Sequence, residues 1–192
     1  DIFRKAHSEG RSSLFEHEVY RVLAAAGIAR APRHEVIAVG AEPKDDLLAS
    51  FPGSRVVVKI VSGSVAHKSD VGGVAVVAKE PSAVRAACAS MRAIKADIAG
   101  VMLTEFIAAD ASGVGSELLV GIRNTRDFGM VITAGTGGVD TELLAASARR
   151  GQAVVSASTA VTTAEEFLDL FKPTIGYRRI AGLARGGRRL VT

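Results

Sequence analysis

Three features of the sequence place charged residues where they could bind a ligand. Lys59 lies inside an apolar run, where a buried ammonium group must reach water, a carboxylate or a bound anion. In the polar segment HKSDVGGV, residues 67–74, Lys68 and successive glycine amides could cradle a phosphate. Glu105 and Glu117 stand at the edges of two further apolar runs, where carboxylates can accept hydrogen bonds from amino or ribose hydroxyl groups or support the ligands of a metal ion.

Taken singly, each feature also has a purely structural explanation. Lys59 could extend to water along its aliphatic stem, and the two glutamates could simply face solvent. His67 could be an ordinary loop histidine that orders the turn after it. The glycine segment does not follow the P-loop pattern, and no helix follows it.

The elements that must position these residues are strands and helices in alternation. Apolar and β-branched runs predict strands, and two of them, joined by a short turn, predict an antiparallel hairpin. The strands are expected at residues 34–39, 55–61, 74–78, 101–106, 117–122 and 129–134, the last two forming the hairpin. We expect residues 55–61 to be buried on both faces, and residues 62–73 and 135–138 to be loops.

Helices are predicted by periodicity and by capping residues. A capping box over residues 13–16 begins a helix that Gly27 ends with a left-handed cap. Pro43 begins a short helix, Pro81 a longer one, and Thr162 or Thr163 caps a third. Residues 1–11 are polar and are expected to be loose. This pattern predicts an α+β fold in two lobes with a hinge near residues 108–115.

Composition excludes several classes of protein. The 192 residues are 48% apolar, which excludes wholesale disorder, and no apolar run is long enough to span a bilayer. The single cysteine, Cys88, allows no internal disulfide, favours a reducing compartment, and is expected in the core rather than as a nucleophile. The net charge of +4 comes from six basic residues between 172 and 192, so we expect no nucleic-acid partner.

In combination and order, the segments VVVKI, HKSDVGGV, LTE, ELLVG and TAGTGG resemble the ATP-grasp domain of the ADP-forming (NDP-forming) acyl-CoA synthetases, relatives of the succinyl-CoA synthetase β subunit. The resemblance covers about residues 13–179. It implies an ATP-grasp fold, with two α/β lobes around a nucleotide cleft and incomplete at the C-terminus. The implied parts are an N-terminal segment packing on the second lobe (1–53), a small lobe (54–110) and a larger, truncated lobe (111–192).

The resemblance also implies roles for individual residues. Lys59 would contact the α-phosphate and adenine region, Glu105 would lie at the adenine–ribose end, and Glu117 would face the nucleotide across the cleft. His67 would be a second phosphoryl carrier, for which a neutral imidazole suits as a nucleophile. The residues expected over the phosphates are Lys68, Ser69, Asp70, Gly72 and Gly73.

The family reaction converts acyl-CoA, ADP and phosphate into acid, CoA and ATP through a phosphohistidine. It implies ATP or ADP and Mg²⁺ as ligands, a CoA-binding phosphohistidine module as partner, and a cytoplasmic location, with a homo-oligomer also open. The late acidic and Asn-Pro-Leu segment that holds the metal in this family is not found up to Thr192, so we expect the main magnesium ligands beyond it and an isolated chain that is inactive.

Two other interpretations remain open. The chain could be a non-catalytic or regulatory ATP-grasp-like module fused to an acyltransferase, or it could belong to a different ATP-grasp ligase, although the HKSD string argues against the latter. A detectable phosphohistidine would separate the synthetase from the regulatory module. The resemblance implies that acyl specificity lies in the CoA-binding module.

Overall fold

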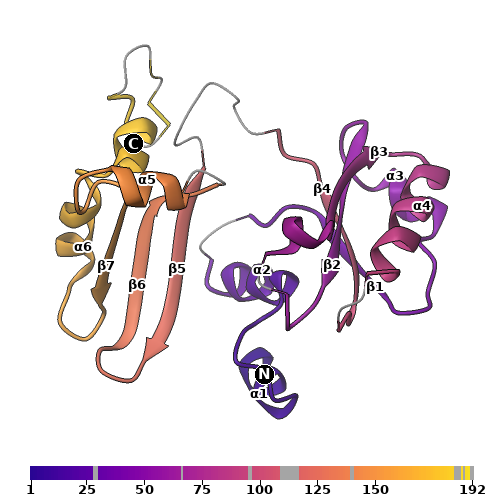
Figure 1. The fold of residues 1–192 in the computed structure, drawn as a ribbon, viewed down its shortest axis with the longest axis horizontal. Helices are drawn as coiled ribbons and strands as arrows, with labels where there is room; N and C mark the ends of the chain where they lie inside the picture. The colour runs from indigo at the N-terminus through magenta and orange to yellow at the C-terminus, as the bar shows by residue number, and fades with distance from the viewer. Residues whose placement is uncertain are drawn as a thin grey trace. The chain divides into compact units, whose positions relative to one another are not determined.

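The computed structural model describes residues 1–27, 30–65, 67–94, 97–108, 117–138, 141–183, 187 and 189–190. The chain divides into two compact units, Asp1–Ile107 (unit 1) and Ala108–Thr192 (unit 2), which Figure 1 shows with their helices and strands. Each unit combines an antiparallel sheet with helices, so the predicted α+β class is confirmed.

The sheet of unit 1 has four antiparallel strands in the order β1-β4-β2-β3. The strands are β1 (His34–Ala38), β2 (Arg55–Val61), β3 (Val74–Ala78) and β4 (Gly100–Glu105), which confirms the four predicted strands within one residue at their ends. In the central strand β2, Lys59 pairs with Met102 on one side and with Val74 on the other. Its side chain is therefore held in the middle of the sheet.

One face of this sheet carries the hydrophobic core. The helices α3 (Asp45–Ala49) and α4 (Pro81–Arg92) supply buried residues to it, and both correspond to predicted helices. Cys88 is fully buried and lies in the core as expected. Burial raises the pKa of its thiol. The buried cluster consists of Ile37, Leu48, Phe51, Val56, Val58, Ile60, Val84, Cys88, Met91, Val101 and Leu103.

The opposite face is only partly covered. Along β2, Val56, Val58 and Ile60 are fully buried, whereas Val57 and Lys59 are half-buried. The expectation that this strand is buried on both faces is therefore wrong. The strand is antiparallel to both neighbours, and the helix α2 (Glu16–Ala25) leaves part of its second face accessible. Figure 1 shows α2 and α4 on opposite sides of this sheet.

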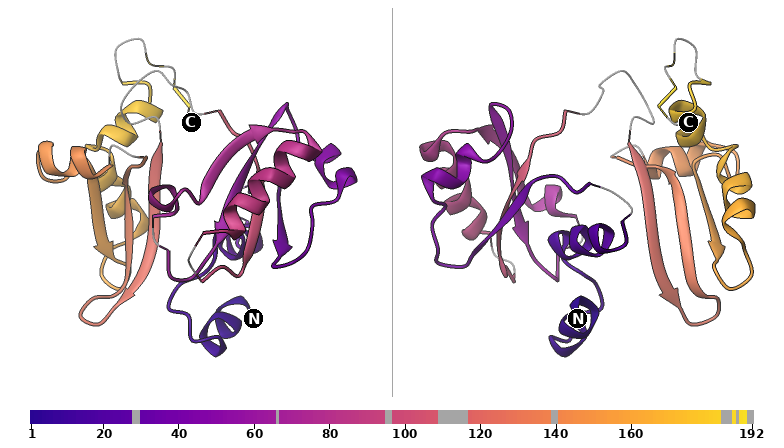
Figure 2. Two further views of the ribbon diagram at one scale, coloured as in Figure 1. Left: turned by 45° about the vertical axis from the view of Figure 1, so that its right-hand side comes forward. Right: turned by 180° about the vertical axis from the view of Figure 1, so that it is seen from behind.

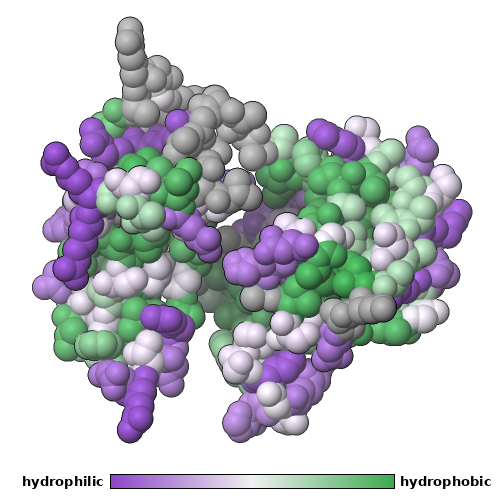
Figure 3. All heavy atoms as spheres, viewed as in Figure 1, coloured by the Kyte–Doolittle hydropathy of each residue, from purple (hydrophilic) through white to green (hydrophobic). Residues whose placement is uncertain are grey.

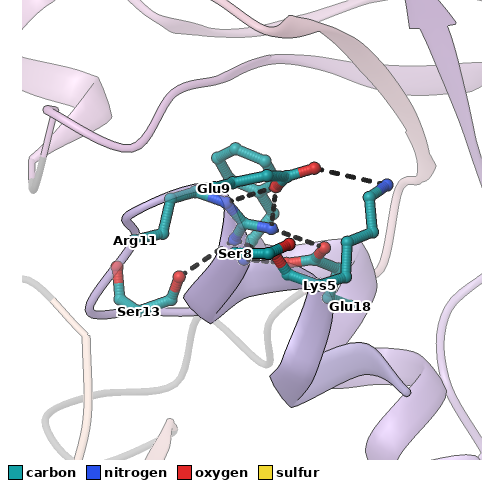
Figure 4. Close-up of polar contacts among 7 residues, drawn as sticks. Lys5, Ser8, Glu9, Arg11, Ser13 and Glu18 are labelled. Carbon is teal, nitrogen blue, oxygen red and sulfur yellow. Dashed lines mark hydrogen bonds and ion pairs between the residues drawn. The ribbon is translucent and has the colours of Figure 1, made fainter.

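The N-terminal residues differ most from the sequence-based expectation. Residues Ile2–Ser8 form the helix α1 rather than a loose segment. Arg11 follows this helix and joins it to α2, because its guanidinium bonds Glu9 at 2.7 Å and Glu18 at 2.8 Å, as Figure 4 shows. The guanidinium also lies 4.0 Å from the ring centre of Phe15. A partly buried, bidentate ion pair between Arg11 and Glu18 thus orders the start of the chain.

The capping box predicted over residues 13–16 is wrong as well. Helix α2 begins after Phe15, and it is Glu18 that accepts the Phe15 amide hydrogen at 2.8 Å. Glu16, the residue expected to reach back, is engaged elsewhere. Gly27 follows the end of the helix with φ +67°, which confirms the predicted left-handed cap.

Unit 2 contains a three-stranded antiparallel sheet in the order β5-β6-β7. The predicted hairpin is confirmed as β5 (Leu118–Thr125) and β6 (Gly129–Thr136), and β7 (Val154–Ser158) is a strand that the sequence did not indicate. The helices are α5 (Thr141–Ser147), α6 (Ala164–Phe171) and α7 (Ile175–Ile180). Thr163 caps α6 as predicted, and Figure 2 shows α6 and α7 on one side of the sheet.

The predicted glycine-rich loop at residues 135–138 is partly strand. Gly135 and Thr136 end β6, and a Cβ atom on Gly135 would overlap the Ala153 carbonyl oxygen. A Cβ atom on Gly176 in α7 would lie 3.2 Å from the Gly135 carbonyl oxygen, and one on Gly137 would lie 2.8 Å from the Leu118 carbonyl carbon. These glycines therefore permit close packing of backbone segments within unit 2.

Apolar side chains are exposed on both units (Figure 3), among them Val120 at 70% and Ile122 at 63% on β5. Within the described part of the chain, no helix combines the length and the apolar character needed to cross a membrane.

Candidate functional site

Lys59 obtains a carboxylate partner from the N-terminal helix. Its side chain extends from β2 toward α2, and its Nζ donates to Glu16 Oε1 at 2.7 Å. The Lys59 side chain is only 23% exposed. Of the three outcomes that a buried ammonium allows, namely water, a carboxylate or a bound anion, the structure has the second.

Lys68 reaches the same carboxylate from a different element. It is the first residue of the short 3₁₀ helix η1 (Lys68–Val71), and its Nζ donates to Glu16 Oε2 at 3.1 Å. Tyr20, one turn further along α2, donates its hydroxyl hydrogen to Oε1 at 2.6 Å. Lys59 and Lys68, which we call the lysine pair, therefore converge on one negative charge.

The lysine pair determines the protonation state of Glu16. Burial alone would raise the pKa of this carboxyl, but the hydrogen bonds from Lys59 and Tyr20 outweigh burial and lower the pKa from 4.5 to about 2. Burial and the neighbouring carboxylate raise the pKa of Tyr20. At neutral pH the cluster thus holds two ammonium groups, one carboxylate and a neutral phenol, with a net positive charge.

The HKSDVGG segment adopts a compact turn that needs both glycines. The turn begins with a bond from the Asp70 amide to the His67 carbonyl oxygen at 3.2 Å. Gly72 ends η1 with φ +70°, in the left-handed region. A Cβ atom on Gly73 would lie 2.7 Å from the Ile60 Cδ1 atom and 2.9 Å from the Lys68 carbonyl oxygen. The glycines therefore let η1 approach β2 closely enough for Lys68 to reach Glu16.

The other side chains of this segment face solvent. His67, Ser69 and Asp70 are exposed, and no hydrogen bond of these side chains to another described residue is present. The backbone carbonyl of His67, not its ring, orders the turn. The imidazole is therefore accessible to a reactant.

A cavity of about 360 Å³ adjoins this cluster. Its walls are the first turn of α2 with the residues before it, the end of β2 with the loop that follows, and two side chains from elsewhere in unit 1. They are Ser13, Leu14, Phe15, Glu16, Val61, Ser62, Gly63, Ser64, Val65, Lys68 and Met102. The Lys68 ammonium, the Glu16 carboxylate that it contacts and the amide end of α2 all border this cavity, and the ammonium and the amides favour an anionic ligand.

The structure does not bring Glu105 to the lysine pair. Glu105 pairs with Val56 across β2 and β4, so its side chain lies on the same face of the sheet as Val56 and on the face opposite to Lys59. It accepts the Arg33 amide hydrogen at 3.0 Å and lies 3.9 Å from Arg30. The adenine–ribose role expected for Glu105 stays a prediction.

Glu117 belongs to unit 2, just before β5, and is exposed. Its carbonyl oxygen accepts the Gly137 amide hydrogen at 2.7 Å. Because Lys59 lies in unit 1, the expected cleft shared by these two residues also stays a prediction, as does the three-part division of the chain.

Sequence reasoning missed Glu16 and Tyr20. It required a partner for Lys59, but no spacing rule joins residues 16 and 59, and Glu16 was interpreted as a helix-capping residue. A possible signal was the i, i+4 pair of Glu16 and Tyr20 at the start of a helix, which places both on one face. Among the described residues, no group of three His, Cys, Asp or Glu side chains could hold a metal ion.

Comparison with known proteins identifies the relatives of this chain. Residues 5–172 match the family described as ATP-grasp domain. The chain is 31% identical to subunit beta of an ADP-forming acetate–CoA ligase from Pyrococcus furiosus, over 97% of this chain and 75% of that subunit. It is 34% identical to an ADP-forming 4-hydroxybutyrate–CoA ligase from Nitrosopumilus maritimus, over 74% of this chain and 20% of that ligase. The chain thus spans a fifth of one relative and three quarters of the other.

A solved structure supports the same relationship. It is the dinucleotide-forming acetyl-coenzyme A synthetase 1 of Candidatus Korarchaeum cryptofilum, in complex with coenzyme A and Mg-AMPPCP, with a phosphohistidine segment pointing towards the nucleotide binding site. The match has a TM-score of 0.62 and 30% identity, and covers 95% of this chain and 73% of that one. Fold, sequence and the resemblance of the HKSDVGGV segment agree: the chain belongs to the ATP-grasp domain family of the ADP-forming acyl-CoA synthetases.

Proposed function

We propose that this chain is the nucleotide-binding part of an ADP-forming acyl-CoA synthetase. The whole enzyme would convert acyl-CoA, ADP and phosphate into acid, CoA and ATP with a CoA-binding module that carries a phosphohistidine. The observation that carries this proposal is that Lys59 and Lys68 both bond the Glu16 carboxylate beside a cavity. The relatives are ligases, which does not favour the alternative of a regulatory module fused to an acyltransferase.

The lysine pair would bind the phosphates of ATP or ADP. Lys59 projects from the central strand of a sheet, so its ammonium group has a well-defined position, and Lys68 lies on a turn fixed by two glycines. Ser69, Asp70, Gly72 and Gly73 would border the phosphates from the same turn. Fixed positive charges of this kind stabilise phosphoryl groups without reorganising during the reaction.

His67 would carry the phosphoryl group between the partner module and the nucleotide. A neutral ring nitrogen would form a P–N bond as the P–N bond of the donor phosphohistidine breaks, and it would then pass the group to the β-phosphate of ADP. The exposed position of His67, one residue before Lys68, supports this role. In a relative, a phosphohistidine segment points towards the nucleotide binding site, which supports phosphoryl transfer at such a site.

Magnesium accompanies the nucleotide analogue in that relative. Because the described residues contain no cluster of metal-ligating side chains, we assign no magnesium ligand and no magnesium-dependent step to them. A cytoplasmic location is part of the proposal, and the presence of only one cysteine favours it.

Calorimetric titration of ADP and ATP into the chain, with Mg²⁺ in the buffer, tests nucleotide binding. We expect Lys59→Ala to weaken binding by about 1–3 kcal/mol, or roughly 5- to 150-fold, because one charge-assisted hydrogen bond to phosphate is lost. Arg85→Ala is the matched control. It removes one positive charge from α4 on the opposite face of the same sheet, where Arg85 forms an ion pair with the exposed Asp45.

Unchanged affinity in Lys59→Ala would contradict the assignment of the phosphate site. Equal weakening by Lys59→Ala and Arg85→Ala would also contradict it, because the effect would then reflect net charge rather than position.

A further inference from the structure

Glu16 is an acidic side chain in the middle of a proposed anion-binding site. It would repel a phosphate, and a site built only to attract phosphates would not contain it. The family resemblance of the sequence assigns it no role. Its contacts therefore need an explanation of their own.

The contacts of Glu16 join three elements of unit 1. Oε1 accepts from Lys59 of β2 at 2.7 Å and from Tyr20 of α2 at 2.6 Å, and Oε2 accepts from Lys68 of η1 at 3.1 Å. The side chains of Glu16, Lys59 and Lys68 are exposed by only 24%, 23% and 22%. Glu16 itself is held at both ends, by its helix and by the Tyr20 hydroxyl. Its carboxylate is thus a fixed point from which the positions of both ammonium groups follow.

We propose that Glu16 is a positioning residue, which holds the ammonium groups of Lys59 and Lys68 at a fixed spacing for the phosphates of the nucleotide. Without it, two like charges on flexible four-carbon stems would repel each other and would sample many rotamers. With Glu16 in place, the two lysine side chains lose their conformational entropy on folding rather than when the nucleotide binds. Nucleotide binding is therefore favoured. This inference rests on the proposed nucleotide-binding function.

The charge and donor inventory is compatible with this role. The two ammonium groups and one carboxylate leave a net positive charge, so attraction for an anion is retained. Each ammonium carries three N–H donors and uses one for Glu16, which leaves donors for phosphate oxygens. The carboxylate does not have to leave for the phosphates to bind.

Glu16→Gln tests the proposal in the chain as it exists, because this substitution keeps the size of the side chain and removes its charge. We expect the Kd for ADP, measured by calorimetry, to rise about 5- to 10-fold, the scale of one lost charged contact. In a Lys59→Ala, Lys68→Ala background, Glu16→Gln should no longer raise the Kd, since a residue that acts through the lysines has nothing left to position. The Kd should stay unchanged or fall there, because a charge that repels phosphate has been removed.

Glu18→Gln is the matched control on the same helix. Glu18 bonds Arg11 and the Phe15 amide but neither lysine, so its substitution should lower the thermal midpoint and leave the Kd for ADP unchanged. A purely structural contribution of α2 would instead make the two variants behave alike.

Side-chain NMR of ¹⁵N-labelled lysine gives a signature that does not depend on ADP. Ammonium groups held in ion pairs exchange their protons slowly, so protected signals are expected for Lys59 and Lys68 in the wild type, each assigned by its loss in the corresponding Lys→Ala variant. Both should be lost in Glu16→Gln and retained in Glu18→Gln.

The outcomes separate the two proposals. Wild-type binding of ADP with an unchanged or lower Kd in Glu16→Gln would overturn the positioning role alone, and so would an equal loss of affinity in the background without the lysines. No binding of ADP or ATP by the wild-type chain would overturn the proposed function, and the positioning role with it.

Discussion

At the scale of single residues, the ion pair between Lys59 and Glu16 is the central feature of the site. An ammonium in the middle of a sheet requires a compensating charge, and Glu16 provides it while also binding Lys68. Three side chains that are each mostly covered therefore remain ionised together. The chemistry proposed for the site depends on this cluster.

The stability of the wild type relative to Glu16→Gln should depend on pH. The folded-state pKa of Glu16 lies at about 2, below its ordinary 4.5, so the stabilisation is fully present above pH 4.5 and is lost as the pH falls toward 2. We expect Glu16→Gln to lower the free energy of unfolding by about 1–3 kcal/mol at pH 6. Urea unfolding should show this difference shrinking at pH 3, and a difference that grows with acidity would contradict the assigned ion pairs.

His67 can be tested in the enzyme reconstituted with its partner module. His67→Asn should abolish acyl-CoA-dependent ATP formation, because a phosphoryl carrier forms a covalent intermediate. It should leave the Kd for ADP within about twofold, because the exposed ring contributes little ground-state affinity. Near-normal turnover of this variant would instead contradict the carrier role of His67.

At the scale of elements, the segment from His67 to Gly73 forms a compact turn that packs on β2. The 3₁₀ helix η1 is short and ends in a left-handed glycine, and the next glycine lies against β2. The Ile60 amide donates to the Gly73 carbonyl oxygen at 2.9 Å, which anchors the turn to the central strand. The position of Lys68 thus depends on residues that carry no functional group.

Gly73→Ala should destabilise unit 1 by about 1–3 kcal/mol, the usual cost of overpacking. Its Cβ would lie 2.7 Å from the Ile60 Cδ1 atom and 2.9 Å from the Lys68 carbonyl oxygen, so β2 or η1 must shift. Gly63→Ala is the control in the same connection, because its Cβ would have no neighbour closer than 3.8 Å. Urea unfolding followed by circular dichroism should separate the two variants, and equal stabilities would argue against the close approach of η1.

At the scale of the whole molecule, the two units differ in how much of their structure is buried. The main hydrophobic cluster, with β2 at its centre, lies entirely in unit 1. Among the described residues of unit 2, the buried apolar side chains are Val131, Ala134 and Ala153. Strand β5 has exposed residues on both faces and pairs with β6 alone in the described sheet.

Hydrogen exchange should reflect this difference between the units. We expect the amides of β2, which have partners on both sides and buried side chains, to exchange at least tenfold more slowly than those of β5. Mass spectrometry of peptides that cover residues 55–61 and 118–125 measures this directly. Equal protection would show that β5 is covered by structure additional to the described sheet.

The sequence by itself determined the strands of unit 1, the β5–β6 hairpin, helix α4, a helix cap at Thr162 or Thr163, and the family. These follow from local signals: β-branched runs, a short turn, a proline or threonine at a helix start, and an ordered set of motifs. It missed α1 and β7 and misassigned the start of α2. Their ends and pairing depend on contacts, such as that of Arg11 with Glu18 or β7 with β6, that no local pattern encodes.

For the candidate site, the sequence determined which residues carry charge and that Lys59 needs a partner. Only the tertiary structure decided that the partner is Glu16, that Lys68 shares it, and that Glu105 alternates onto the other face. The physical reason is that ion pairing depends on distance in space. Residues 16, 59 and 68 become neighbours only when α2 packs on one face of a sheet whose register points Lys59 toward it.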